Sequence, residues 1–170
     1  MKFTITCAVV AALICTEPAV AAAPLKVTSI QELSQLPTPL PYPYDEKANA
    51  DAQVNAALAK AKAEHKLAFI DLGGNWCGDC LILANFVQLP EIRRFMQAHY
   101  EEVSVDVGRF NRNLQVPARF GITKKLEGVP ALLIATPDGK LVNGDKIFAT
   151  ADARNMTPQA LADYLARYAD

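Results

Sequence analysis

Cys77 and Cys80 are the side chains best suited to chemistry in this sequence, and they lie in the segment Trp76-Cys77-Gly78-Asp79-Cys80. The residues after Cys77 predict a helix, and one helical turn brings two sulfurs at this spacing close enough to bridge. The first thiol would lie at the positive end of the helix dipole, which favours its thiolate form. Because the thiolate is the attacking species in thiol–disulfide exchange, we expect Cys77 to be the nucleophile and Cys80 to be the resolving thiol.

Three other uses of the pair compete with this one: half of a zinc site, a static disulfide, or two unrelated core cysteines. A tetrahedral zinc site needs two more ligands, and the remaining soft donors of the mature chain are His65 and His99. They lie at predicted helix ends, far apart and without metal-ligand spacing, so we predict no metal. Closing so short a loop constrains the unfolded chain little, which disfavours a purely structural disulfide.

Residues 1–23 have the order of a secretory signal peptide: a short basic start, an apolar run, and then a cluster of alanines. The apolar run is shorter than the roughly 20 residues that span a bilayer, so we expect cleavage and no membrane span afterwards. Cleavage would remove Cys7 and Cys15 and leave the later pair as the only cysteines. We therefore expect an exported protein, which would be periplasmic if the host is a Gram-negative bacterium.

The composition fits one globular domain, because 51% of the 170 residues are hydrophobic and 21% are charged. The formal net charge of −1 gives no electrostatic reason to bind nucleic acid or an anionic membrane. The prolines of residues 24–46 predict a leader that either dangles or lies on the surface of a domain formed by residues 47–170. We expect a monomer.

Helical and strand patterns alternate along residues 47–170 and predict an α/β fold. Their order predicts a three-layer α/β/α arrangement with a central mixed sheet. Thr157 and Pro158 are typical of the start of a helix, and Pro137-Asp138-Gly139 is typical of a tight turn between antiparallel strands. The expected elements are a helix at 47–65, a strand at 67–72, a helix from 77 to about 88 that Pro90 interrupts before it resumes at 91–99, a strand at 103–107, a short helix at 114–120, a hairpin of 131–136 with 140–142, and a final helix from 158.

Over about residues 64–170 the chain resembles the thioredoxin superfamily. The features that carry the resemblance are an acidic residue on the preceding strand, Asp71, the Trp-Cys-Gly-X-Cys segment, and Gly128-Val129-Pro130 before a later strand. The resemblance implies that Pro130 is cis, that it lies opposite the cysteines, and that the backbone of Val129 pairs with substrate polypeptide. Without the resemblance, Pro130 would be only a proline at the start of a strand.

Asp71 lies six residues before Cys77, where the resemblance implies a buried acid that assists deprotonation of Cys80. Desolvation should raise the pKa of such a carboxyl and make it a proton acceptor. The alternative is an aspartate at the strand end that the glycine-rich turn leaves in solvent. We expect the residues around the cysteines, Trp76, Gly78 and Asp79, to contact substrate together with Val129 and Pro130.

The sequence departs from the family pattern at two charged positions and in one length. Asp79 stands where thioredoxins usually carry proline, Glu102 aligns with their lysine near the buried acid, and the segment from Asp106 to Pro130 is longer. A negative charge at Asp79 should disfavour the Cys77 thiolate and make the pair more reducing, since strong oxidants have a stabilised thiolate.

We therefore expect a thiol–disulfide oxidoreductase that reduces disulfides of exported proteins and exchanges electrons with an unidentified donor or acceptor. The redox-active disulfide Cys77–Cys80 would need no metal or organic cofactor. One alternative runs the same site as an oxidase or isomerase. Another is a thioredoxin-fold binding protein or chaperone that uses the leader or the loop at residues 109–112.

Overall fold

The structure, a computed structural model, describes residues 24–169, so the predicted signal peptide lies outside the described residues. The expected α/β order is confirmed, with small shifts at the element ends. The elements are η1 (Leu33–Gln35), α1 (Ala50–Glu64), β1 (Leu67–Gly73), α2 (Gly78–Phe86), α3 (Pro90–His99), β2 (Tyr100–Asp106), α4 (Gln115–Arg119), β3 (Ala131–Ala135), η2 (Ala153–Asn155) and α5 (Pro158–Ala166).

Strand β1 is the centre of a three-stranded mixed sheet with the order β2-β1-β3. It runs parallel to β2 and antiparallel to β3, and Asp71 is paired with Ser104 on one side and with Leu132 on the other. Every residue of β1 after Leu67 is buried, as a central strand with both faces covered requires. The carboxyl end of β1 leads directly into the cysteine segment, so the central strand positions that segment.

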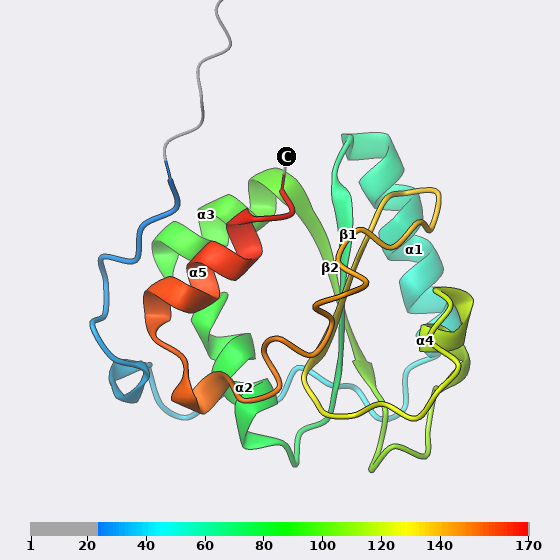
Figure 1. The fold of residues 1–170 in the computed structure, drawn as a ribbon, viewed down its shortest axis with the longest axis horizontal. Coiled ribbons are helices and arrows are strands. Elements are labelled where there is room, and N and C mark those ends of the chain that lie inside the picture. The colour runs from blue at the N-terminus through cyan, green and yellow to red at the C-terminus, as the bar shows by residue number, and fades with distance from the viewer. Residues whose placement is uncertain (1–23, 170) are drawn as a thin grey trace, which may run out of the picture.

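Helices cover both faces of the sheet, which confirms the three-layer arrangement (Figure 1). Helices α2, α3 and α5 lie on one face, and α1 and α4 lie on the other. Side chains alternate between the two cores: Phe69 and Leu132 face the first group of helices, whereas Ile70 and Leu133 face the second.

The predicted interruption at Pro90 is confirmed, and one strand begins earlier than predicted. Helix α2 ends at Phe86 and α3 begins at Pro90, where the missing N–H breaks no helical hydrogen bond. Strand β2 begins at Tyr100, whose buried ring packs on Phe69 with the centroids 5.6 Å apart. The Tyr100 hydroxyl donates to the carbonyl of Leu165 at 2.7 Å, so tertiary contacts extend this strand.

The prediction of a second hairpin strand is wrong, because residues 140–142 make only one isolated bridge to the sheet. The predicted turn is present, and Gly139 closes it with a φ of 83°. Beyond the turn, the side chain of Asn143 replaces a strand backbone: its oxygen accepts from the N–H of Ile134 and its amide donates to the carbonyl of Leu132, both at 2.8 Å. The Asn143 amide, together with the backbone of Val142 and Ile147, thus satisfies the edge of β3 where a strand was expected.

The proline-rich leader lies along the domain and enters its core. Near its start, the backbone N–H groups of Thr28 and Ser29 donate to the carboxylate of Glu91 on α3 at 2.8 and 2.9 Å. The leader side chains that are buried are Ile30, Leu36 and Tyr44. These contacts go beyond the predicted surface location, because leader residues belong to both hydrophobic cores.

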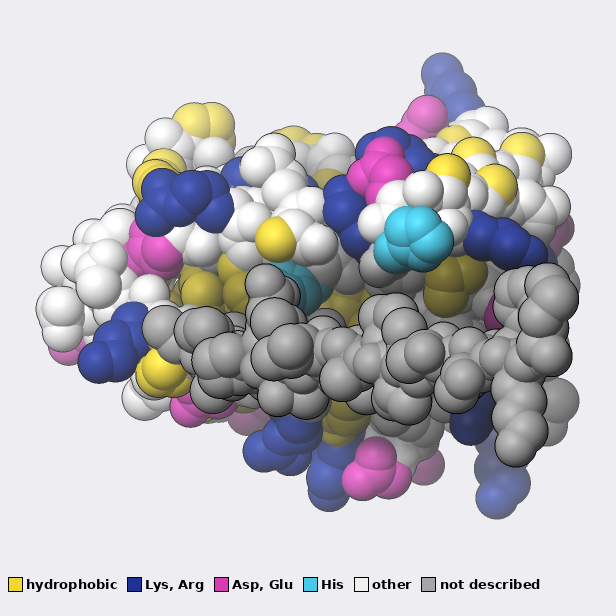
Figure 2. Space-filling view, turned by 90° about the horizontal axis from the view of Figure 1, so that it is seen from above, with side chains coloured by type: hydrophobic (Ala, Val, Ile, Leu, Met, Phe, Trp, Pro, Cys, Tyr) yellow, Lys and Arg dark blue, Asp and Glu magenta, His cyan; other side chains and the backbone are white. Residues whose placement is uncertain are grey.

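Figure 2 shows the face of the molecule that is uppermost in Figure 1. Basic and acidic side chains are interspersed there, and histidine side chains lie among them. His65 follows the last residue of α1 and His99 ends α3, as predicted. Within residues 24–169, no helix combines the length and apolar character needed to cross a bilayer.

Candidate active site

Cys77 and Cys80 form a disulfide at the start of α2, with their Cα atoms 5.2 Å apart. The chain turns after β1, and the N–H of Cys77 donates to the carbonyl of Gly74 at 3.0 Å. Cys77 is the N-cap of α2, and its Sγ accepts from the backbone N–H of Cys80 at 3.2 Å. A donor N–H and a helix N-terminus both stabilise negative charge, so the geometry favours Cys77 as the thiolate.

The two sulfurs differ in accessibility as well as in position on the helix. Cys80 is fully buried, whereas 6% of the Cys77 surface is exposed to solvent. The residue that follows Cys77, Gly78, is exposed. An incoming disulfide can therefore reach Cys77 but not Cys80 in this arrangement.

The predicted proline loop lies against the disulfide. The Val129–Pro130 peptide bond is cis, as the resemblance implies, and both residues are buried. The carbonyl oxygen of Val129 lies 3.5 Å from the Sγ of Cys77. In the reduced protein this oxygen can accept the thiol proton, which favours the protonated thiol over the thiolate.

Trp76 forms an exposed aromatic surface beside Cys77. The residue is 41% exposed, although its Nε1 donates to the carbonyl of Gly108 at 2.8 Å. The guanidinium of Arg109 lies 4.6 Å from the ring centroid, and Phe110 meets the ring edge-on. The longer segment after β2 therefore contributes to the surface around the cysteines.

Asp79 does not present a free charge, because Arg154 of η2 holds its carboxylate. The guanidinium donates from Nη2 at 2.7 Å and from Nε at 2.9 and 3.1 Å, and the Arg154 backbone N–H donates at 2.9 Å. Burial acts to raise the pKa of Asp79, but these hydrogen bonds hold it below its usual value. The carboxylate therefore stays ionised, and the partner cation offsets its effect on Cys77.

Asp71 is the predicted buried acid, and it has a partner that the sequence did not reveal. Its Oδ2 accepts from the hydroxyl of Tyr44, a leader residue, at 2.6 Å. Burial raises the pKa of Asp71 from 3.8 to about 7; the Tyr44 hydrogen bond acts against this shift, whereas the Glu102 charge adds to it. A carboxyl with this pKa can both accept and release a proton near neutral pH.

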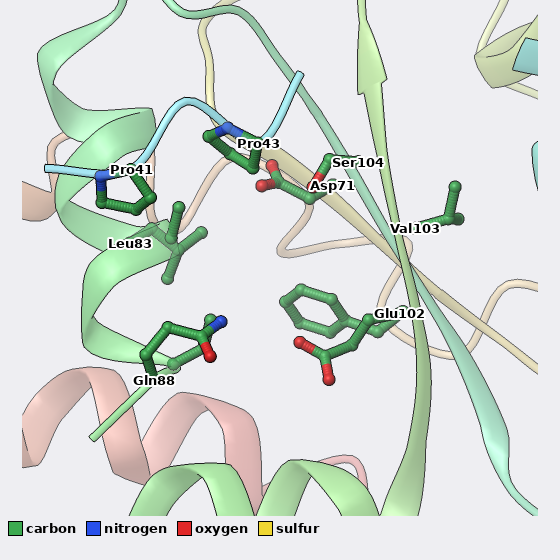
Figure 3. Close-up of a pocket in the computed structure, with 11 residues that line it drawn as sticks. Pro41, Pro43, Asp71, Leu83, Gln88, Glu102, Val103 and Ser104 are labelled. Carbon is green, nitrogen blue, oxygen red and sulfur yellow. The ribbon is translucent and has the colours of Figure 1, made fainter. Parts of the chain in front are cut away.

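A cavity of about 140 Å³ lies beside Asp71, between the leader and β2 (Figure 3). The prolines of the leader cover it, and Glu102, which is paired with Arg93, lies on its far side. Oδ1 of Asp71 finds no hydrogen-bond partner among residues 24–169. The cavity is large enough for water, and the carboxyls of Asp71 and Glu102 border it although most of its lining is apolar. A water there could hydrogen-bond to this oxygen. Its lining residues are Pro41, Pro43, Phe69, Asp71, Leu83, Ala84, Val87, Gln88, Glu102, Val103 and Ser104.

The structure thus gathers the cysteines, Asp71, Trp76, Gly78, Val129 and Pro130 at one end of the sheet, while Asp79 is turned to Arg154. Sequence reasoning missed two residues, Tyr44 and Arg154. Tyr44 lies in a segment read as a surface leader, and the only available signal was an aromatic residue next to a proline run. Arg154 follows Asp79 by 75 positions, and its only signal was the opposite charge.

Metal ligands do not converge in the described part of the chain. Between residues 24 and 169, no three side chains among histidine, cysteine, aspartate and glutamate are grouped so that they could hold an ion. The donor chemistry of the site is therefore that of the two sulfurs and the buried carboxyl.

Comparison with known proteins agrees with this geometry. A family model described as thioredoxin-like matches residues 49–137. A solved structure described as a disulphide isomerase from Xylella fastidiosa Temecula1 is 36% identical, with a TM-score of 0.70; the match covers 78% of this chain and all of that one. A Pseudomonas aeruginosa protein of unknown function matches at 16% identity and a TM-score of 0.39, over 71% of this chain and 85% of that one. None of the curated proteins compared with the chain matches it.

Proposed function

Because the chain belongs to the thioredoxin-like family, we propose that it is a thiol–disulfide oxidoreductase that reduces disulfides in exported proteins. The observation that carries the proposal is the position of Cys77, which is the N-cap of α2, lies against Val129 and is bridged to the enclosed Cys80. The electrons reside in the cysteine pair itself, so the reaction needs no metal or organic group.

In the proposed reaction, the Cys77 thiolate attacks a substrate disulfide, forms a mixed disulfide and releases one substrate sulfur as a thiolate. Cys80 then loses its proton and attacks the Sγ of Cys77, which releases the second substrate thiolate. Two electrons pass from the dithiol to the substrate, and the protein ends with the Cys77–Cys80 disulfide. A separate thiol donor must reduce this disulfide before the next cycle.

The surroundings of Cys77 support the reductive direction. One N–H stabilises its thiolate, but the carbonyl of Val129 favours the thiol. No arginine or lysine makes an ion pair or hydrogen bond with Cys77 within residues 24–169, and the nearby Arg154 is held by Asp79. Since strong oxidants owe their potential to a stabilised thiolate, this site suits a more reducing pair.

The reduction potential tests the direction. The protein is equilibrated in glutathione buffers of graded ratio, and the fraction of oxidised Cys77–Cys80 is measured. We expect a reduction potential close to that of thioredoxin, which is about −270 mV. A potential close to that of a strong oxidant, about −120 mV, would contradict the reductive direction. Cys77→Ser should abolish reduction of a disulfide-bonded protein substrate. Full biological activity in the cell after Cys77→Ser would instead favour a binding protein.

Disulfide isomerisation is the second candidate, and the name of the Xylella structure is the observation that favours it. An isomerase would restore native pairing in a scrambled substrate without net consumption of reductant, and its potential would lie near about −180 mV. The test measures how much native protein is recovered from a scrambled substrate with stoichiometric and with catalytic amounts of the reduced enzyme. Recovery with catalytic amounts and no added reductant indicates an isomerase.

Export and partners remain part of the proposal. The N-terminal pattern of residues 1–23 supports export, and a Gram-negative host would place the protein in the periplasm. We expect a monomer whose partners are protein thiols and an electron donor. Secretion of the mature chain, with its N-terminus determined by mass spectrometry, tests the location.

A further inference from the structure

We propose that the leader supplies a working part of the active site: the Tyr44 hydroxyl lies on the path by which Cys80 passes its proton to Asp71. This inference rests on the proposed thiol–disulfide function and concerns its second step, the resolution of the mixed disulfide. Tyr44 is a proton relay in that step, because its hydroxyl takes the proton of Cys80 and gives its own to Asp71.

The Tyr44 hydroxyl lies next to both groups that the proton must connect. It donates to Oδ2 of Asp71 at 2.6 Å. Above Gly73, a Cβ atom would lie 2.5 Å from this hydroxyl and 2.9 Å from the Sγ of Cys80, so the oxygen and the sulfur share one small space. Glycine at position 73 leaves this space free of a methyl group, so the hydroxyl and the sulfur border the same gap.

The leader holds this hydroxyl in place at both the backbone and the ring. The N–H of Tyr44 donates to Oδ1 of Asn75 at 3.2 Å, and the amide of Asn75 donates to the carbonyl of Tyr44 at 2.8 Å. The ring is 1% exposed and packs in the same core as the two cysteines. Because Asn75 belongs to the turn before Cys77, the tyrosine moves with the active-site turn.

The charges around Asp71 determine which proton transfers are feasible. Tyr44 faces it from the leader, Cys80 belongs to the adjacent α2, and Glu102 lines the cavity from β2 with Arg93 as its partner. Burial, with the Asp71 charge, raises the pKa of Tyr44 well above 10.0, so the phenol keeps a proton at neutral pH. A protonated hydroxyl can donate to Asp71 while it accepts from Cys80.

The proposed step is balanced in protons and electrons. Cys80 gives its S–H proton to the Tyr44 oxygen, and Tyr44 passes its own proton to Asp71. The Cys80 sulfur then bonds to the Cys77 sulfur, and the bond from Cys77 to the substrate sulfur breaks with its electron pair. The substrate leaves as a thiolate, and Asp71 releases the proton to water in the adjoining cavity.

The attack of Cys77 and the resolution by Cys80 can be measured separately, as two kinetic phases of one exchange reaction. The reduced protein is mixed in a stopped-flow instrument with dithionitrobenzoate, a small aromatic disulfide that releases one coloured thiolate at each exchange. The first release reports Cys77, and the second reports resolution by Cys80. We expect Tyr44→Phe to leave the first phase unchanged and to slow the second about tenfold at pH below 7. This is less than the roughly hundredfold or more that one acid–base group contributes, because water can partly replace the hydroxyl.

The pH profile distinguishes a proton path from a merely structural role. The Tyr44 hydrogen bond lowers the pKa of Asp71, so its loss should move the midpoint of the second phase from near 7 to a higher pH. In an Asp71→Asn background, Tyr44→Phe should produce no further slowing, because the acceptor is already absent. Tyr42→Phe is the matched control, since this leader tyrosine is 72% exposed.

The outcomes are distinct. A second phase with the wild-type rate and midpoint in Tyr44→Phe would overturn the inference while leaving the proposed function intact. The same slowing of both phases would also overturn it, because it would indicate general disruption of the site. If reduced wild-type protein showed no first phase, or if Cys77→Ser retained it, the proposed function itself would fail.

Discussion

Replacement of Asp71 by asparagine is expected to stabilise the folded protein above neutral pH and to change its stability little near pH 4. The folded-state pKa of about 7 exceeds the ordinary value of 3.8 because the carboxyl is buried. Between these two values the folded state binds a proton that the unfolded state releases, so stability falls as the pH rises. Asparagine stays neutral, and its oxygen can still accept the Tyr44 hydroxyl.

The pKa difference sets the size of this effect. A rise of about 3 units, at about 1.4 kcal/mol per unit, corresponds to about 4 kcal/mol of lost stability once the pH exceeds the folded-state pKa. Asp71→Asn should recover most of this amount near pH 8. Even half of this stability difference would be a large fraction of the free energy of unfolding of a small domain.

Urea unfolding of the oxidised protein measures the difference. Wild type and Asp71→Asn are compared near pH 4, 6 and 8, and the slope of the free energy with urea should be the same for both. Asp138→Asn removes a carboxylate from the exposed turn and is the matched control. A wild-type advantage near pH 8, or a difference that did not vary with pH, would refute the reasoning.

Three further predictions concern other described contacts. Burial acts to raise the pKa of Glu91, but the hydrogen bonds that it accepts from the leader N–H groups lower the pKa to about 2. Glu91→Gln should therefore destabilise the protein above pH 4.5, and the destabilisation should disappear as the pH falls towards 2. Thermal unfolding at graded pH measures this difference. Asp79→Asn should lower the pKa of the Cys77 thiol, since it frees the Arg154 cation near the site. An unchanged or raised pKa in a thiolate absorbance titration would contradict this. Thr157→Ala should cost about 1 kcal/mol in urea unfolding, because the Thr157 hydroxyl accepts the N–H of Ala160 at 3.1 Å and caps α5.

The features that the sequence predicted correctly depend on residues close together in the chain. A helix start such as Thr157-Pro158, a break such as Pro90 and a cysteine pair within one turn are each determined by local backbone geometry. The central strand was recognisable because β1 is a short apolar run left through glycines. Its partners were assigned less accurately at the ends, where Tyr100 extends β2 by packing against distant residues.

The features that were missed depend on contacts between residues far apart. Asp79 looked like an uncompensated charge because Arg154 lies 75 positions away. The leader looked like a surface segment because prolines satisfy no ladder of hydrogen bonds, although Tyr44 is held by Asn75 and Asp71. In both cases a single long-range polar contact decides the role of the residue, and no local pattern predicts it.

The leader, which supplies Tyr44 to the active site, is held in part by the helix α5 that is synthesised long after it. Gln159 on α5 accepts from the N–H of Val27 at 3.1 Å and donates to the carbonyl of Leu25 at 2.8 Å, across 132 and 134 positions. The leader is among the first parts of the folded domain to be made, and α5 is the last. A chain that has not yet reached α5, or that has lost it, therefore has its cysteine pair but lacks the Gln159 contacts that hold the leader.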